Sequence, residues 1–416
     1  MNSVNFICNK FSKEIRIIKS EPILLLAFPV SLISFSIIFI LSTFVKIRVG
    51  FIRSEKLGHF AADIELYLCE RDNNNNSFID IFYLTRKPCN QQLAIMWARK
   101  LRIFPLFFLR PLDLIIRSFS FLSSFHVQDA KNEDRDIDNL YEKFPPHLNF
   151  TADELVHGQT KLMAMGIPKD ANFICLTVRD NSYLNLRKEF DPTHDCSYHN
   201  YRDSDIQNYN LAAESLAERG YFVFRMGVKV NKPLNSRHPN VIDYSTNGMR
   251  SDFMDIYLGA KCMFCITVGT GFDAVPMIFR RPIVQVNAVP LGYSFTWKKT
   301  IILLTKHHIE VKNSRKLALN EIFKRGLGSC LRTSDYESKG IMLIENTPEE
   351  IRDAVIEMEE RISGTWKEHP EDKLLQKRFW EIFDKDALDF KGRRLHGKIY
   401  TLFSSSFLRS NKAWLS

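Results

Sequence analysis

The stretch CMFCITVGTGFDAVPMIFRRPIVQVN, residues 262–287, decides the fold class. A β-rich apolar run at 262–268 is followed by a Gly-Thr-Gly turn, an apolar helix-like run at 272–282 and a second β-rich run at 283–287. Two strands with a helix between them form a parallel pair. Glycine at such a junction permits a tight turn, and it also permits the backbone to approach a phosphate or a sugar.

The same alternation extends over residues 169–345. Strands are predicted at 172–178, 221–227 and 240–245, and helices at 205–220 and 251–260. Strand and helix patterns that alternate at this spacing predict a doubly wound α/β domain with a parallel sheet covered on both faces.

The rest of the chain divides into three parts. Residues 46–168 begin with a β-loop-α unit at 46–68 and end with a capped helix that starts after Thr151 and stops near Gly166. Residues 346–416 predict a helical tail whose first helix is capped by Thr347, and residues 1–45 form a basic segment with an apolar stretch.

Composition excludes several classes of protein. The 416 residues are 45% hydrophobic and 12% aromatic, so the chain is globular rather than disordered. The net charge of +9 is dispersed, and no basic face interleaved with aromatic residues or nucleic-acid reading motif is present, so no nucleic-acid partner is expected. The eight scattered cysteines predict free thiols in a reducing compartment; Cys262 and Cys265 are expected to be buried, with redox or metal work as the alternative.

The apolar stretch ILLLAFPVSLISFSIIFILSTFV, residues 23–45, carries no charge and is long enough to cross a bilayer. It predicts a membrane anchor, with a buried hairpin or a monotopic helix as the alternative. Residues 91–125 are both apolar and basic, which predicts either a helical region packed in a core or a patch lying on the membrane.

Ligands of open parallel sheets bind beyond the carboxyl ends of the strands, so the residues that follow each predicted strand are the site candidates. After 262–268 come Gly269, Thr270, Gly271 and Asp273 at a predicted helix N-terminus, where backbone amides attract anions. Pure turn geometry is the alternative reading of these glycines.

A long loop follows the predicted strand 172–178. It contains Arg179, Asp180, Tyr201, Arg202 and Asp203. Two arginines clamp a diphosphate well, and carboxylates bind sugar hydroxyls or accept a proton. Surface salt bridges that hold the loop are the alternative.

Two further positions complete the candidate set. Arg225 and Gly227 end the strand 221–227 and offer a second place for backbone approach, while Gly58 and His59 lie in the loop of the first β-loop-α unit. His59 is either an acceptor-side base or a packed histidine.

Four stretches of the chain resemble a family of bacterial glycosyltransferases of the GT-B type. They are IRVGFIRSEKLGHFAADIELYL, LTVRDNSYL, YHNYRDSDIQNYNLAAESLAERGYFVFRMG and VGTGFDAVPMIFRRPIVQVN, which cover most of residues 46–290. The C-terminal KIYTLFSSSFLRSNKAWLS is similar to that family's ending.

The resemblance implies an α/β fold of two facing Rossmann-like domains, with a nucleotide-sugar donor held mainly by the C-terminal domain, the acceptor by the N-terminal one, no cofactor and no essential metal. It places Gly269, Thr270 and Gly271 at the donor phosphates, Arg179 and Arg202 as phosphate clamps, and Gly58 with His59 on the acceptor side. Tyr201 joins them as an acceptor-side residue.

The expected reaction is sugar transfer to a cell-envelope glycan or a lipid-linked acceptor by a protein at the bacterial inner membrane, with its catalytic domains facing the cytoplasm. Asp180, His59 and Asp203 are the candidate bases. The rival interpretations are a nucleotide-sugar epimerase on the same scaffold and a membrane-tethered scaffold of polysaccharide assembly without catalysis.

Overall fold

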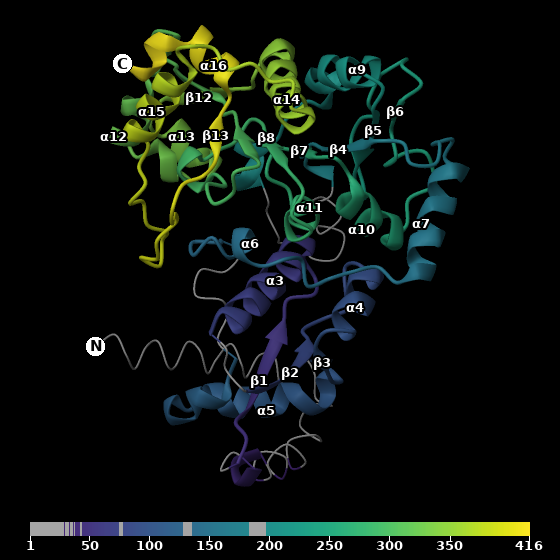
Figure 1. Cartoon of the computed structure of the whole chain (residues 1–416). Coiled ribbons are helices and arrows are strands. Elements are labelled where there is room, and N and C mark those ends of the chain that lie inside the picture. The colour runs from purple at the N-terminus through teal and green to yellow at the C-terminus, as the bar shows by residue number, and fades with distance from the viewer. Residues whose placement is uncertain are drawn as a thin grey trace. The chain divides into compact units, whose positions relative to one another are not determined.

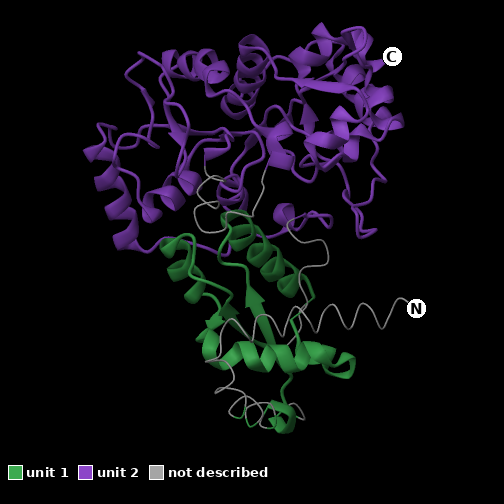
Figure 2. Ribbon diagram, turned by 180° about the vertical axis from the view of Figure 1, so that it is seen from behind, with its two compact units in different colours: residues 1–133 green, residues 134–416 purple. Residues whose placement is uncertain are grey.

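The computed structural model describes residues 29, 33, 36, 38–41, 44–74, 78–127, 135–182 and 197–416. The chain forms two compact units, residues 1–133 and 134–416 (Figure 2). The boundary expected at residue 168 falls inside the second unit. The reason is that α7 (Ala152–Ala164) packs on α10 (Asp252–Lys261), so closely that a Cβ at Gly158 would lie 2.1 Å from the Tyr257 ring.

Unit 1 is built on a small parallel sheet. Its elements are β1 (Ile47–Ile52), α3 (Leu57–Asn74), β2 (Ile79–Leu84), α4 (Gln91–Ala98), β3 (Arg102–Ile103), α5 (Leu106–Ser118) and the 3₁₀ helix η1 (Ser120–Phe125). The strands pair in the order β1-β2-β3, so the predicted β-loop-α start is confirmed. Within the described residues this sheet has three strands, fewer than a regular Rossmann pattern, because the run at 91–125 is largely helical.

Residues 91–125 were expected either to pack in a core or to lie on a membrane, and one face of α5 packs in the core of unit 1. Leu109, Leu112 and Ile116 are buried in a cluster with Val49 and Tyr83 of the sheet. In Figure 1, α5 runs across β1 and β2. The helix therefore covers the sheet with one face, while phenylalanines near both of its ends are exposed.

Most of the predicted anchor, residues 23–45, lies outside the described residues. None of the helices that the structure describes combines the length and the apolar character needed to cross a membrane.

Unit 2 contains a seven-stranded parallel sheet in the order β13-β9-β8-β7-β4-β5-β6. The strands are β4 (Phe173–Thr177), β5 (Phe222–Met226), β6 (Val241–Ile242), β7 (Cys265–Thr267), β8 (Ile283–Gln285), β9 (Ile301–Leu303) and β13 (Leu402–Phe403). Apart from β13, the chain order of the strands across the sheet is 3-2-1-4-5-6 counted from β4, which is the doubly wound order. The α/β prediction for this half is confirmed.

Helices cover both faces of this sheet. α9 (Asn210–Glu218) and α14 (Pro348–Ser363) lie on one side, and α10 and α11 (Ala274–Ile278) on the other (Figure 1). The core between them is apolar, with Cys175, Cys262 and Cys265 fully buried in it. The six described cysteines form no disulfide, which fits the expectation of free, buried thiols.

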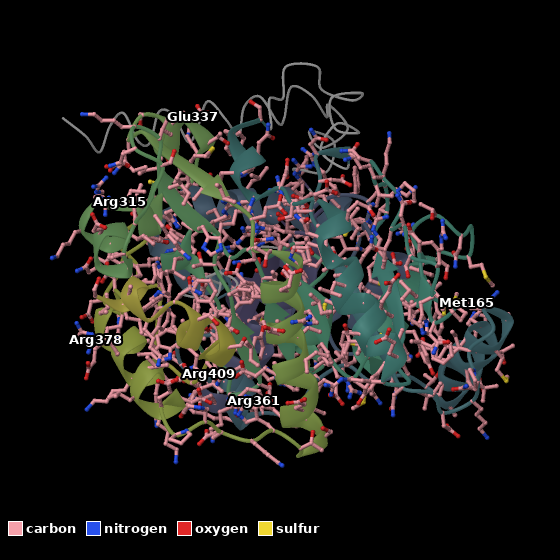
Figure 3. The ribbon with its side chains drawn as sticks, turned by 90° about the horizontal axis from the view of Figure 1, so that it is seen from above. Met165, Arg315, Glu337, Arg361, Arg378 and Arg409 are labelled. Atoms are coloured by element: carbon pink, nitrogen blue, oxygen red, sulfur yellow. The ribbon has the colours of Figure 1, made fainter. Side chains whose placement is uncertain are left out.

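The C-terminal segment belongs to the same unit rather than to a separate tail. The capping box of Thr347 and Glu350 starts α14 as expected, and β13 later joins the sheet beside β9. Buried Glu357 of α14 accepts the Ser405 amide at 2.7 Å, which ties α14 to α16 (Ser405–Ser410). α15 (Asp372–Ile382) is tied to α16 by Arg409, which is labelled in Figure 3 and forms an ion pair with Asp372 at 2.5 Å.

The remaining elements of unit 2 are mostly short. They are α6 (Leu140–Lys143), η2 (Ser197–Arg202), η3 (Ile206–Tyr209), η4 (Leu291–Tyr293), β10 (His307–Glu310), β11 (Arg315–Lys316), α12 (Leu319–Lys324), η5 (Leu327–Ser329), α13 (Thr333–Glu337), β12 (Ile341–Ile344) and η6 (Lys412–Leu415). The antiparallel sheet β11-β10-β12 was not predicted from the sequence.

Candidate active site

The strand order places the topological switch point of the sheet at the carboxyl ends of β4 and β7. These neighbouring strands mark the point where the connections turn to opposite sides of the sheet, and doubly wound proteins bind ligands there. The segments after the two strands come together, since the hydroxyls of Thr177 and Thr270 lie 3.3 Å apart. The sequence prediction of a site in these two loops therefore falls on the switch point.

Gly269 is required by the geometry of the turn after β7. Its φ is +80°, a conformation that costs a residue with a Cβ about 1–2 kcal/mol. A Cβ there would lie 3.3 Å from Gln285 Nε2 and 3.5 Å from Arg202 Nη2. The close approach of the backbone is thus toward protein side chains, one of which is the predicted clamp Arg202.

The amides of this turn are engaged internally, which differs from the expected phosphate cradle. The amides of Gly269 and Thr270 donate to Thr267 Oγ1 at 3.0 and 3.4 Å, and Thr267 in turn donates to Asp273 at 3.1 Å. Asp273 is 3% exposed, so it holds the turn from within the core. α11 has only five residues, and Gly271 before it is exposed.

Three cationic side chains gather beside the turn. Arg179 Nε donates to Asp203 Oδ1 at 3.0 Å, and Lys306 Nζ donates to the Asp203 carbonyl at 2.6 Å. Arg202 donates from Nη2 to the carbonyl of Gly269. Asp203 is the one carboxylate hydrogen-bonded to a cation of this group in the described part of the chain, while Asp273 and Glu345 act on Arg202 and Lys306 through their charges.

Burial works against the charged forms of the side chains in this group. Burial lowers the pKa of Arg202, and the charge of Arg179 lowers it further. Burial also lowers the pKa of Lys306, which is 4% exposed. The pKa of Asp203 is raised by burial even though Arg179 opposes the shift.

One atom of this group points to a missing partner. Nη2 of Arg179 is buried and has no hydrogen-bond partner among the residues that the structure describes. A buried guanidinium nitrogen without an acceptor is costly, and phosphate oxygens satisfy guanidinium forks well. The arrangement is suited to a phosphate or another small anion.

Asp180 lies close to this group in the chain but has a different role. Its two oxygens accept the amides of Ser182 and Asn231, each at 2.9 Å. These bonds occupy both carboxylate oxygens and join two loops, so the side chain of Asp180 has a structural role.

Arg225, Gly227 and Tyr201 are integrated into the fold. Arg225 is 1% exposed and bonds Asp243 at 3.3 Å, Ser245, and the Lys232 carbonyl at 3.2 Å. A Cβ at Gly227 would lie 2.7 Å from the Val230 side chain, so packing alone accounts for this glycine.

Tyr201 was expected to be an acceptor-side residue. It is instead buried in unit 2, with its ring centroid 5.5 Å from that of Tyr336, and burial raises its pKa to about 12. Tyr201 therefore packs where an acceptor contact was expected.

His59 and Gly58 lie in the first turn of α3 in unit 1. His59 Nδ1 is 3.2 Å from Asp63 Oδ1, and Arg53 Nε is 3.4 Å from the other oxygen of Asp63. Together with Tyr67 these side chains line a pocket of about 40 Å³. A carboxylate fixes the orientation of the imidazole, as it does for histidines that accept protons.

Sequence reasoning missed Lys306 and Thr177. Lys306 interrupts the apolar run IILLT after β9, and a charged residue directly after a buried strand was a usable signal. Around the three cations, no group of three or more metal-ligating side chains occurs within the described ranges. Metal independence stays a prediction.

The chain matches no protein-family model and no curated protein sequence. Among solved structures it is similar to a glycosyl transferase family 9 protein from Veillonella parvula, with a TM-score of 0.41 and 11% identity over 77% of this chain and 96% of that chain. It is also similar to the E. coli ADP-heptose LPS heptosyltransferase II, with a TM-score of 0.37 and 13% identity over 62% of this chain and 90% of that one. Because both scores are below 0.5, the assignment of the architecture rests on the strand order.

Proposed function

We propose that the chain is a glycosyltransferase that binds a nucleotide-sugar donor at the switch point of unit 2. The observation that carries this proposal is the buried, unpartnered Nη2 of Arg179 beside Arg202 and Lys306. A nucleoside diphosphate brings several negative charges on a compact group, and three cations with one carboxylate partner are suited to hold it.

In this proposal the cations act on the leaving group. The bond between the anomeric carbon and the diphosphate oxygen breaks while the acceptor hydroxyl forms the new glycosidic bond. Arg179, Arg202 and Lys306 stabilise the negative charge that develops on the departing diphosphate, which is the task that a metal ion performs in other enzymes.

The acceptor proton requires a base, and His59 is the strongest of the three candidates. Asp63 orients its ring at 3.2 Å, whereas Asp180 is occupied by two amides and Asp203 by Arg179. The proposed acceptor is a cell-envelope glycan or a lipid-linked sugar.

Thermal unfolding of the full chain tests the donor site. A ligand that binds the folded state raises Tm by mass action, so we would measure Tm with UDP, GDP, ADP, TDP, CMP and pyrophosphate, each with and without magnesium. We expect one diphosphate nucleotide to raise Tm, and Arg179→Gln to abolish the rise.

Arg219→Gln is the matched control, because Arg219 forms a partly exposed ion pair with Glu359 at 2.7 Å in the same unit. It should keep the full response. A folded protein that responds to none of these ligands would contradict the proposal and favour the scaffold interpretation.

Product analysis with the nucleotide sugar of the responding base separates the two enzymatic interpretations. A transferase releases nucleoside diphosphate in proportion to glycosylated acceptor. An epimerase changes the sugar without stoichiometric release of nucleotide, and that outcome would replace the transferase proposal.

A further inference from the structure

Unit 1 exposes an unusual number of aromatic side chains. Phe104 and Phe108 lie at the start of α5, and Phe119 and Phe121 follow its end; their exposed fractions are 47%, 52%, 51% and 76%. Rings of this size are among the most favourable to bury, so four exposed ones near a single helix require an explanation.

The preceding segment adds to the same surface. Ile38 is buried in the cluster that contains Leu112 and Phe125, and the Phe39 ring lies 6.1 Å from that of Phe125. The neighbouring described residues are exposed although they are apolar: Phe39, Ile40, Leu41, Phe44 and Val45. We call these five residues and the four phenylalanines the apolar surface of unit 1.

Basic residues accompany the apolar surface. Between residues 99 and 127 the chain has five basic side chains, Arg99, Lys100, Arg102, Arg110 and Arg117, and one acidic one, Asp113. Asp113 is fully buried, where it accepts from Tyr83 at 2.8 Å and lies 2.9 Å from His126. The solvent side of this region is therefore positive, since Arg99, Lys100 and Arg102 are exposed.

We propose that the apolar surface of unit 1 binds the interface of a lipid bilayer that contains anionic headgroups. Phenylalanines that insert among acyl chains, with arginine and lysine beside them at the headgroups, are the pattern of interfacial membrane binding. Five residues of this surface, Phe39, Ile40, Leu41, Phe44 and Val45, belong to the uncharged sequence run 23–45.

The charge decides between this occupant and a second copy of the chain. Two copies meeting through this surface would bring the same basic side chains together, and among the exposed residues 99–121 no acidic side chain is available to pair with them. Anionic lipid supplies the opposite charge.

The first test measures binding of the full chain to vesicles. Phosphatidylcholine vesicles with phosphatidylglycerol should bind more protein than vesicles of phosphatidylcholine alone, and salt should weaken this preference. The double variant Phe119→Ser/Phe121→Ser should bind on the order of tenfold more weakly or worse, because two large rings no longer insert. Phe390→Ser is the matched control: Phe390 is 78% exposed but belongs to unit 2, and its loss should change nothing.

Photolabelling by lipid provides a second test. It distinguishes binding through the apolar surface of unit 1 from binding through residues 23–45 alone. A photoreactive group attached to a lipid acyl chain should label peptides covering 104–121, and should leave the peptide with Phe390 unlabelled. Labelling confined to residues 23–45, equal labelling of both peptides, or a wild-type dimer that the double variant dissociates would overturn the proposal. Nucleotide-induced stabilisation should be the same in the double variant, so this result is independent of the donor site.

Discussion

Arg202→Met should separate ligand binding from folding. In the unligated protein the Arg202 guanidinium is partly buried close to Arg179, and burial together with that like charge lowers its pKa. The charge of Arg202 therefore contributes little to the stability of the folded protein unless an anion is bound beside it. Methionine keeps much of the side-chain volume and removes the repulsion.

The two effects have different sizes. The variant loses one charge-assisted bond to the Gly269 carbonyl, about 1.5–3 kcal/mol, and this loss is offset by the relieved burial and repulsion of the charge. We expect Tm of the ligand-free protein to stay within about 3 °C of wild type. A phosphate bonded by this guanidinium loses a similar 1.5–3 kcal/mol with no compensation, so Kd should rise roughly ten- to a hundredfold.

The assay is a titration of the full chain with the nucleotide that gives the largest thermal shift, followed by calorimetry for Kd. Arg219→Met makes the same chemical change at the ion pair with Glu359 and should alter neither Kd nor the ligand-induced shift. If Arg202→Met instead lowered Tm by more than about 6 °C and left Kd unchanged, Arg202 would serve only to hold the Gly269 turn, and the reasoning would be refuted.

Three further outcomes follow from the geometry. Gly269→Ala should lower the free energy of unfolding by about 1–2 kcal/mol in urea titrations and weaken nucleotide binding, because φ is +80° at this residue. Gly271→Ala, at the nearby exposed glycine, should do neither. Equal effects of the two substitutions would show that φ is not the cause. His59→Ala should slow transfer on the order of 10²-fold or more while the nucleotide-induced shift persists, and exposed His157→Ala is its control; unchanged turnover would remove His59 as the base. Burial lowers the pKa of His308 to about 4, so between pH 6.5 and 4 the unfolded chain binds more protons than the folded protein and the free energy of unfolding falls as pH falls. His308→Gln should reduce this loss of stability by about 2–3 kcal/mol. An unaltered pH profile of the urea midpoint would contradict this prediction.

Five of the seven strands of the large sheet, β4 to β8, were predicted from the sequence, whereas β9 and β13 were not. Residues 173–177 and 283–285 are buried throughout and apolar except for Thr177 and Gln285 at their ends, which distinguishes them from the loops that follow. β10 and β12 were not predicted because each has only four residues and is only partly buried, and their pairing with each other is fixed by the tertiary fold.

We identified Arg179, Arg202 and Asp203 as candidates because they follow a predicted strand. That criterion could not distinguish residues that contact a ligand from residues that stabilise the fold. Asp273 and Arg225 are also an aspartate and an arginine near the ends of predicted strands, like Asp203 and Arg179. In the structure both form hydrogen bonds within the protein. The distinction lies in whether a polar atom is satisfied, which depends on contacts between distant segments. Lys306 shows the converse, since it reaches Asp203 from 103 residues away.

The balance of charge around the two buried arginines differs. Both terminal nitrogens of Arg225 are bonded, to Asp243, Ser245 and the Lys232 carbonyl, its buried Nε has no described acceptor, and the charges that act on it are the carboxylates of Asp243 and Asp180. Arg179 has Asp203 on Nε and nothing described on the buried Nη2, although Arg202 stands close by with the same charge. Each arginine therefore has one buried nitrogen without a described acceptor, and what distinguishes Arg179 is the second cation, Arg202, beside it. In our proposal the acceptor for Nη2 of Arg179 is an anionic ligand. Leaving this atom without an acceptor lowers the stability of the ligand-free protein, and the same atom strengthens ligand binding.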